Sequence, residues 1–161
     1  MRILVDGDAT PYKDEIYSLT KTYHIEMHVY VDYAHILKDV PYQVIECDIG
    51  HDSVDLLLLS HLQKQDILIT QDYGLAALAL GKGAYILHIS GMEITSQNID
   101  ELLLRRYIGA HQRKSGKHIK GPSKQTQEDK QYFLAQLENL LKNLTDRVKF
   151  FCQIKNNINM G

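Results

Sequence analysis

The sequence predicts an α/β fold of three layers, α/β/α, in which helices cover both faces of a mostly parallel β-sheet. Short apolar segments alternate along the chain with segments of helical periodicity, and strands separated by helices pair in parallel. Aspartates follow two of these apolar segments, Asp6 immediately and Asp72 after Thr70 and Gln71, where open α/β sheets bind their ligands. The length of 161 residues and the apolar fraction of 44% are those of one ordinary globular domain.

The predicted elements alternate from the N-terminus. A strand over residues 2–5 precedes a helix in which Thr10 would be the N-cap and Pro11 the first helical residue. One face of this helix carries apolar residues at helical spacing, namely Tyr12, Ile16, Leu19 and Tyr23. Further strands are predicted at residues 25–31, 42–47, 66–70 and 84–88, and further helices at about 50–63, 73–80 and 97–108.

The last predicted helix begins near Thr126, with two acidic residues in its first turn. Its apolar residues form one stripe, namely Phe133, Leu137, Leu140, Leu141 and Leu144. Beyond Leu144 the periodic signal fades. We therefore expect one domain over residues 1–144 and a C-terminal extension over 145–161 that is partly frayed, from about Lys155 onward.

The cysteines and the apolar segments indicate in which cellular compartment the protein is expected. The two cysteines, Cys47 and Cys152, lie far apart and form neither a disulfide framework nor a zinc motif. The chain starts in a strand without a basic leader, and its longest run of leucines is only Leu56 to Leu59. We therefore expect a cytoplasmic protein that is neither secreted nor associated with a membrane.

The first strand ends in two like charges. Asp6 and Asp8 are two residues apart on an extended chain, so both side chains point to the same side. Their repulsion destabilises the strand end unless a cation or a proton lies between them. A divalent metal ion would resolve this repulsion. The alternative is that the two carboxylates only cap a turn.

Three further aspartates are expected to join this pair. Asp72 follows the strand at 66–70, while Asp52 and Asp55 lie on one face of a helix start, where Asp52 could instead be a cap. If the first and fourth strands are neighbours, the carboxylates converge. Such oxygen ligands suit Mg²⁺ or Mn²⁺, which hold phosphate oxygens and activate water. The candidate metal ligands are Asp6, Asp8, Asp52, Asp55 and Asp72, of which Asp6, Asp8, Asp55 and Asp72 are also the catalytic candidates.

A basic segment stands out against an acidic remainder. From Leu102 to Gln127 there is no Asp or Glu, and the seven positive residues are Arg105, Arg106, Arg113, Lys114, Lys117, Lys120 and Lys124. The other 11 Lys and Arg face all 20 acids, so the rest of the chain carries a net charge of −9. Such segregation favours a polyanionic partner, and we expect a nucleic acid, RNA rather than DNA. A solvated helix end is the alternative, and a homodimer is left open.

The motifs together resemble those of the YaiI/YqxD family of uncharacterised bacterial proteins. The matching stretches are Asp6-Gly7-Asp8-Ala9-Thr10-Pro11, Gly50-His51-Asp52-Ser53-Val54-Asp55, Ile69-Thr70-Gln71-Asp72-Tyr73-Gly74-Leu75-Ala76 and Lys120-Gly121-Pro122, with Asp129 following. The resemblance implies a domain similar to the PIN and NYN nuclease folds, with an acidic pocket. The family commonly has Cys where this chain has Thr10, which argues against a thiol nucleophile.

The sequence is compatible with three functions. The resemblance and the carboxylates favour a divalent-metal-dependent nuclease, a phosphodiesterase acting on RNA or DNA. Asp6-x-Asp8-x-Thr10 also resembles the first motif of haloacid-dehalogenase-type phosphatases, in which the first Asp is a covalent nucleophile. Thr70 and Lys82 could then serve the later motifs, although the late acidic pair of that family is missing here. The third function is a metal-free RNA-binding module.

Overall fold

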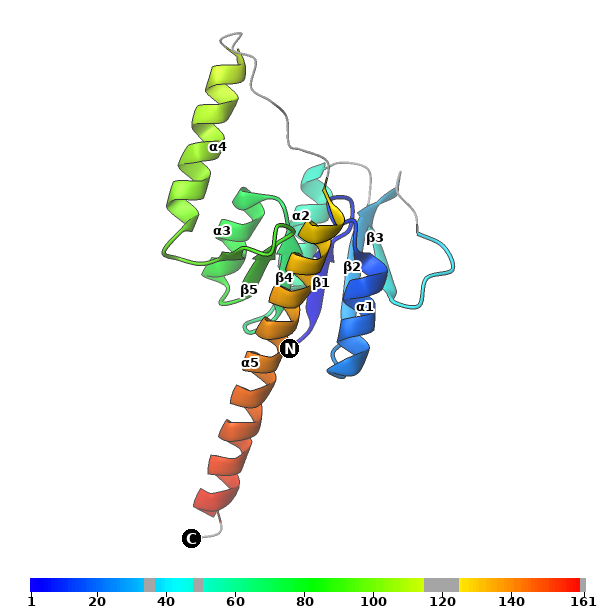
Figure 1. Cartoon of the computed structure of the whole chain (residues 1–161), viewed down its shortest axis with the longest axis vertical. Coiled ribbons are helices and arrows are strands. Elements are labelled where there is room, and N and C mark those ends of the chain that lie inside the picture. The colour runs from blue at the N-terminus through cyan, green and yellow to red at the C-terminus, as the bar shows by residue number, and fades with distance from the viewer. Residues whose placement is uncertain (34–36, 48–50, 115–124, 160–161) are drawn as a thin grey trace.

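The computed structural model describes residues 1–33, 37–47, 51–114 and 125–159, leaving out the side chains of 51–53, 156, 157 and 159. Its strands are β1 (Ile3–Asp6), β2 (Met27–Asp32), β3 (Gln43–Cys47), β4 (Ile67–Thr70), β5 (Tyr85–His88) and β6 (Glu93–Ile94). Its helices are α1 (Lys13–Thr22), α2 (His51–His61), α3 (Tyr73–Gly81), α4 (Ile99–Lys114) and α5 (Gln127–Asn159). Figure 1 shows the sheet between these helices.

The strands form one sheet in the order β3-β2-β1-β4-β5-β6. The pairs from β3 to β5 are parallel, and only β6 runs antiparallel to its neighbour. This confirms the predicted α/β architecture with a mostly parallel sheet. β6 was not predicted, because two residues are too short to show a periodicity. The neighbouring positions of β1 and β4 bring the ends of these two strands together, as the carboxylate argument required.

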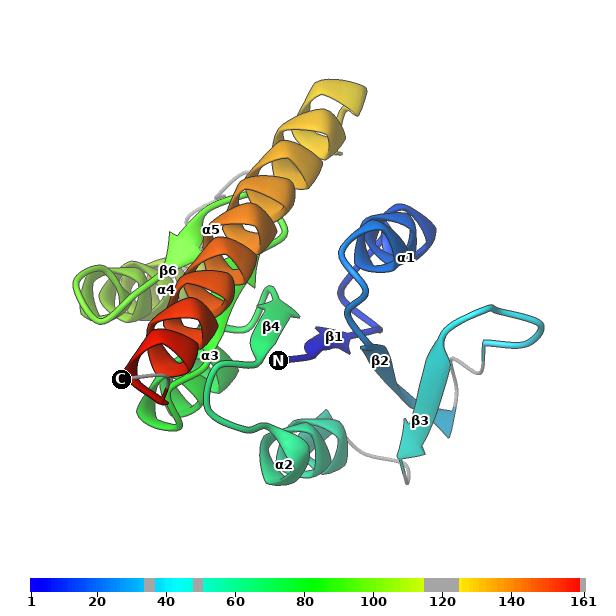
Figure 2. The ribbon, with the colours of Figure 1, turned by 90° about the horizontal axis from the view of Figure 1, so that it is seen from below.

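Helices cover both faces of the sheet (Figure 2). On one face, α1 and α5 pack through Ile16 and Phe133 against a core that includes Val5. On the other face, α2 and α3 pack through Leu58 and Ala76 against a second core. The three residues Ile3, Leu4 and Val5 of β1 are all fully buried, as expected of a central parallel strand.

The predicted start of the first helix is wrong. α1 begins at Lys13 with Tyr12 as its N-cap, which makes no capping side-chain hydrogen bond. The Thr10 hydroxyl instead donates to the backbone oxygen of Asp6, at 2.8 Å. This bond stabilises the turn after β1, so Thr10 is part of that turn and does not cap the helix. Pro11 precedes the helix.

The last helix is longer than expected. The helix begins where predicted, and Thr126 and Asp129 cap its N-terminus through reciprocal hydrogen bonds of 2.8 to 3.1 Å. α5 then runs unbroken to Asn159, and the expected fraying from about Lys155 stays a prediction. Figure 1 shows the helix projecting past the sheet, and the apolar side chains after Leu144 become exposed, beginning with Val148. The domain division at residue 144 stays a prediction.

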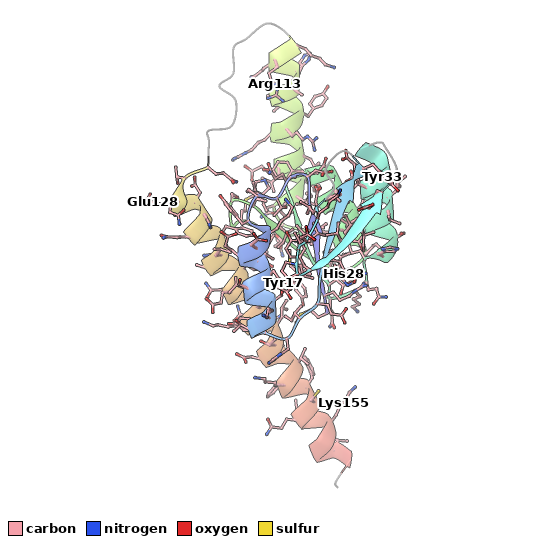
Figure 3. The ribbon with its side chains drawn as sticks, turned by 90° about the vertical axis from the view of Figure 1, so that its right-hand side faces the viewer. Tyr17, His28, Tyr33, Arg113, Glu128 and Lys155 are labelled. Atoms are coloured by element: carbon pink, nitrogen blue, oxygen red, sulfur yellow. The ribbon has the colours of Figure 1, made fainter. Side chains whose placement is uncertain are left out.

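α4 also extends beyond its predicted end at residue 108. It reaches Lys114, and Ile99 is its buried residue. In Figure 1 the helix rises away from α3 and the sheet, and Figure 3 places Arg113 near its far end. The basic residues of α4 therefore lie on a projecting helix, and this helix, Ile99–Lys114, is called the arm below.

Two expectations about composition can be compared with the structure. Cys47 is buried, Cys152 is exposed, and both are free thiols, so no disulfide joins them. None of the described helices combines the length and the apolar character needed to cross a membrane.

Candidate active site

A pocket of about 490 Å³ lies at the carboxyl ends of β1 and β4. Its lining residues are Asp6, Asp8, Ala9, Val54, Asp55, Gln71, Asp72 and Arg106. Four of the five predicted carboxylates thus meet in one pocket. The fifth, Asp52, lies in the first turn of α2, and its side chain is outside the described set.

The turn after β1 depends on Gly7. Its N–H donates to the Tyr30 oxygen of β2 at 2.8 Å. A Cβ atom at this position would lie 2.7 Å from the same oxygen and 2.6 Å from a methyl carbon of Val31. Glycine is therefore required at this position, because the backbone of the turn passes close to β2 there. Asp6 and Asp8 are the residues on either side of Gly7.

Asp6 is a strongly perturbed acid of the pocket. Burial raises the pKa of its carboxyl group, a hydrogen bond from Thr70 lowers it, and the charges of Asp55, Asp8 and Asp72 raise it further, to about 6. The Thr70 hydroxyl donates to Asp6 Oδ2 at 2.9 Å. An acid in this environment gains from a bound cation, because the neighbouring carboxylates repel its charged form.

The pKa of Asp6 predicts how stability depends on pH without metal. Because the folded protein holds this proton up to about pH 6, against 3.8 for the ordinary carboxyl group, ionisation of Asp6 costs stability as the pH rises from 4 to 8. We expect Asp6→Asn to match the wild type near pH 4 and to exceed it at pH 8 by about 1 to 3 kcal/mol. Urea denaturation in EDTA across this range measures the difference. A variant that is less stable at every pH would make Asp6 a structural cap.

Asp72 differs from Asp6 in that donors surround it. It is the N-cap of α3, and its Oδ1 accepts from the backbone N–H of Gly74 at 2.7 Å and of Leu75 at 3.2 Å. Arg106 Nη1 donates to the same oxygen at 3.0 Å. Burial alone would raise the pKa of Asp72, but the bonds from Arg106, Leu75 and Gly74 outweigh burial and leave the pKa below its ordinary value. Asp72 is therefore ionised at neutral pH.

Asp8 is an exposed lining residue of the pocket, and its charge acts on a second cation, that of Lys13. The backbone N–H of Asp32 donates to Asp8 Oδ2 at 3.4 Å, and Lys13 donates to the Thr10 oxygen at 2.5 Å. Burial lowers the pKa of Lys13, while attraction from Asp8, Asp14 and Asp6 partly offsets that effect. Lys13 was not among the predicted site residues, although its place in the first turn after the acidic motif was a usable signal.

The donor set of the pocket suits a hard divalent cation in chemistry. All four acids offer carboxylate oxygens, and one guanidinium, that of Arg106, is among the lining residues. Carboxylates are the ligands that Mg²⁺ and Mn²⁺ prefer. Among the residues whose side chains are described, however, no three His, Cys, Asp or Glu lie close enough together to hold a metal ion.

The predicted phosphate-binding residues divide into four groups. Arg106 enters the pocket, whereas Arg105 forms an exposed ion pair of 2.6 Å with Glu101 on α4. Arg113 and Lys114 are exposed at the end of α4. Three more lie outside the described residues, namely Lys117, Lys120 and Lys124.

Thr70 and Gln71, the two polar residues before Asp72, also hold the turns of the pocket in place. The Gln71 side chain donates to the Ala9 oxygen and thereby joins the turns after β1 and β4. The backbone N–H of Asp72 donates to the Thr70 hydroxyl at 3.0 Å. Thr70 therefore bridges Asp6 and Asp72. A polar residue that ends an otherwise apolar strand is the signal for such a role.

The phosphatase alternative required Lys82 near Asp6. Lys82 is instead the C-cap of α3, at the opposite end of that helix from the Asp72 N-cap. A helix of nine residues is about 13 Å long. The Lys82 ammonium group donates to the Leu59 oxygen, and it is not part of the pocket lining.

Comparison with known proteins places the chain among bacterial relatives without an assigned activity. Residues 4–143 match the model of a family described as uncharacterised BCR, YaiI/YqxD family. A UPF0178 protein of Natranaerobius thermophilus is 41% identical over 150 residues, which cover 92% of this chain and 99% of that protein. A UPF0178 protein of Alkaliphilus oremlandii is 43% identical over 147 residues, which cover 88% and 95% respectively. No solved structure gives a significant match.

Proposed function

The chain belongs to the YaiI/YqxD family, and we propose that it is a divalent-metal-dependent phosphodiesterase that cleaves nucleic acid, RNA rather than DNA, in its acidic pocket. Family membership supplies no activity, since the relatives carry none in their names. The proposal therefore depends on the chemistry of the pocket residues.

One observation carries the proposal. Four carboxylates from β1, α2 and the β4–α3 junction line a single pocket together with one arginine. The burial of Asp6 among the other acids is unfavourable for the protein alone, and a cap would need only one carboxylate. An acidic cluster of this kind is explained by a cation that binds there.

The residues of the pocket would share the work of hydrolysis. Asp6, Asp8 and Asp55 would hold Mg²⁺ or Mn²⁺, with Asp72 beside them and Asp52 completing the set from α2. The ion when bound supplies Lewis-acid stabilisation of the phosphate and activation of a water molecule. Arg106 would orient the substrate, because a guanidinium binds phosphate oxygens in a forked geometry. Its ion pair with Asp72 keeps this donor at the pocket.

A metal-free RNA-binding module is the second candidate function. The observation that favours it is the absence, within the described side chains, of three ligating groups close enough to hold an ion. In this case Arg106 and the other basic residues of α4 would bind phosphates, and the carboxylates would have no catalytic role.

Hydrolysis of a labelled single-stranded RNA in Mg²⁺ or Mn²⁺ tests the proposal. We expect cleavage that EDTA abolishes and that returned metal restores, because the carboxylates act only through the ion. Binding without cleavage in every divalent metal would favour the RNA-binding module. A fluoroberyllate adduct trapped on Asp6 would instead support the phosphatase, since only covalent catalysis phosphorylates the protein.

A further inference from the structure

Tyr107 on α4 carries an aromatic ring that the protein leaves open to solvent. Its side chain is 70% exposed. The ring stacks on that of His111, with centroids 6.4 Å apart and an angle of 16° between the planes. Residues four apart lie on the same side of a helix, so the pair forms one flat aromatic surface on the arm.

Positive charge lines this surface. Arg106 and Arg113 are seven residues apart and therefore share a helix face, about 10 Å apart along the axis. Lys114 lies seven residues after Tyr107, in the adjoining row. No acid occurs between Leu102 and Lys114. The aromatic surface is thus bordered by a row of cations, and the row begins at Arg106, whose guanidinium lies 3.0 Å from Asp72 in the pocket.

Exposed aliphatic residues next to the rings need an explanation too. Leu104 is 57% exposed and Ile108 is 44% exposed, and both lie within one turn of Tyr107. A protein partner could cover them, but a surface with several cations and no acid along 13 residues is complementary to a polyanion. Aromatic rings and cations together match the bases and phosphates of a nucleic acid.

We propose that Tyr107 and His111 form a base-stacking platform for single-stranded nucleic acid, whose backbone follows Arg106 and Arg113 toward the acidic pocket. The proposal rests on the proposed function for the direction of the strand, while the stacking itself needs no hydrolysis. A duplex hides the faces of its bases, so the platform selects unpaired strands. Stacking on an aromatic ring accepts any base, so little sequence preference is expected.

Binding in EDTA tests the platform apart from catalysis. The probes are a fluorescent oligouridylate of eight nucleotides and a strand of equal length whose central residues are abasic but keep their phosphates. We expect the wild type to bind the oligouridylate more tightly. Tyr107→Ala should weaken this binding by roughly 5- to 150-fold, since stacking contributes about 1 to 3 kcal/mol per base, and should leave the abasic strand unaffected. Tyr107→Phe should keep the preference.

Two control variants separate stacking from charge and from exposure. The double change Arg113→Ala/Lys114→Ala should weaken binding of both strands alike and flatten the salt dependence by roughly one unit or more, because phosphate contacts carry that dependence. Phe150→Ala removes a ring that is 63% exposed on α5, on the part of the helix that projects past the sheet. It should change neither affinity.

The outcomes distinguish the platform from the proposed function. Equal affinity of the wild type for both strands, or unchanged oligouridylate binding by Tyr107→Ala, would overturn the platform even if the protein cleaves RNA. A base preference that depends on Tyr107 in a protein that cleaves nothing would uphold the platform and reject the nuclease. If Tyr107→Ala instead dissociates a dimer in sedimentation, the ring covers a second copy and the platform is wrong.

Discussion

Replacing Asp55 by asparagine is expected to lower metal-dependent cleavage of single-stranded RNA by roughly 10³-fold, which corresponds to about 4 kcal/mol of transition-state stabilisation. Asp55 comes from α2, whereas Asp6 and Asp8 come from the end of β1. It is therefore the carboxylate through which a second element would hold the ion. The amide keeps the shape of the side chain but removes its charge, so the loss should appear in the rate of cleavage and in Mn²⁺ affinity measured by calorimetry.

The matched control is Asp146→Asn. It removes one carboxylate at an exposed position of α5 beyond Leu144 and should change neither cleavage nor Mn²⁺ affinity. Both variants should keep a free energy of unfolding within about 1 kcal/mol of the wild type, because neither change is made in the core. A variant of Asp55 that binds Mn²⁺ and cleaves RNA at the wild-type rate would contradict the proposed role of this residue.

The placement of the acids could be predicted because it follows from chain direction. Asp6 ends β1 and Asp72 follows the last residue of β4 by two positions, and the carboxyl ends of parallel strands lie at one edge of the sheet. The pairing of β1 with β4 then brings these two residues together. The pocket therefore required only the strand assignments and one assumption about neighbours. The likeness to PIN domains beyond this architecture stays a prediction.

The partner of Asp72 could not be predicted in this way. Arg106 lies 34 residues further along the chain, and its approach depends on how α4 packs against α3, which no local pattern reports. The sequence identified Arg106 only as a member of a basic segment. Its ion pair with Asp72 now makes it the link between the basic arm and the acidic pocket.

Local side-chain bonds account for the misplaced helix start. Thr10 and Pro11 satisfy the preferences for an N-cap and a first helical residue. The Thr10 hydroxyl is nevertheless used by the Asp6 oxygen, and the same turn must pass close to β2 at Gly7. Tertiary contacts of the strand end therefore outweigh a capping contribution of about 1 kcal/mol.

The extent of α5 was underestimated for a different reason. The adjacent Phe150 and Phe151 disturb the one-sided stripe that ends at Leu144, although the backbone continues as a helix to Asn159. Both rings are exposed, at 63% and 64%. Periodicity detects a helix through the surface that it buries, so a helical segment that buries little is hard to recognise.

Phe133→Ala is expected to destabilise the protein by about 3 to 5 kcal/mol, whereas Phe151→Ala should change the free energy of unfolding by less than about 0.5 kcal/mol. Each change removes one phenyl ring, and both rings belong to α5. Phe133 is fully buried, and its ring lies 5.7 Å from that of Tyr12 in the core formed by α1, α5 and the sheet. Its removal would leave a cavity between α5 and the rest of the domain.

Urea denaturation of both variants measures this contrast and also tests the division of the chain at residue 144. If α5 contributes to stability only where it covers the sheet, the two variants differ by at least about 2.5 kcal/mol, and the helix beyond Leu144 is an extension of the domain. Equal losses would instead show that residues after Leu144 pack against something in solution. In that case the exposed rings of Phe150 and Phe151 belong to an interface, and the domain does not end at residue 144.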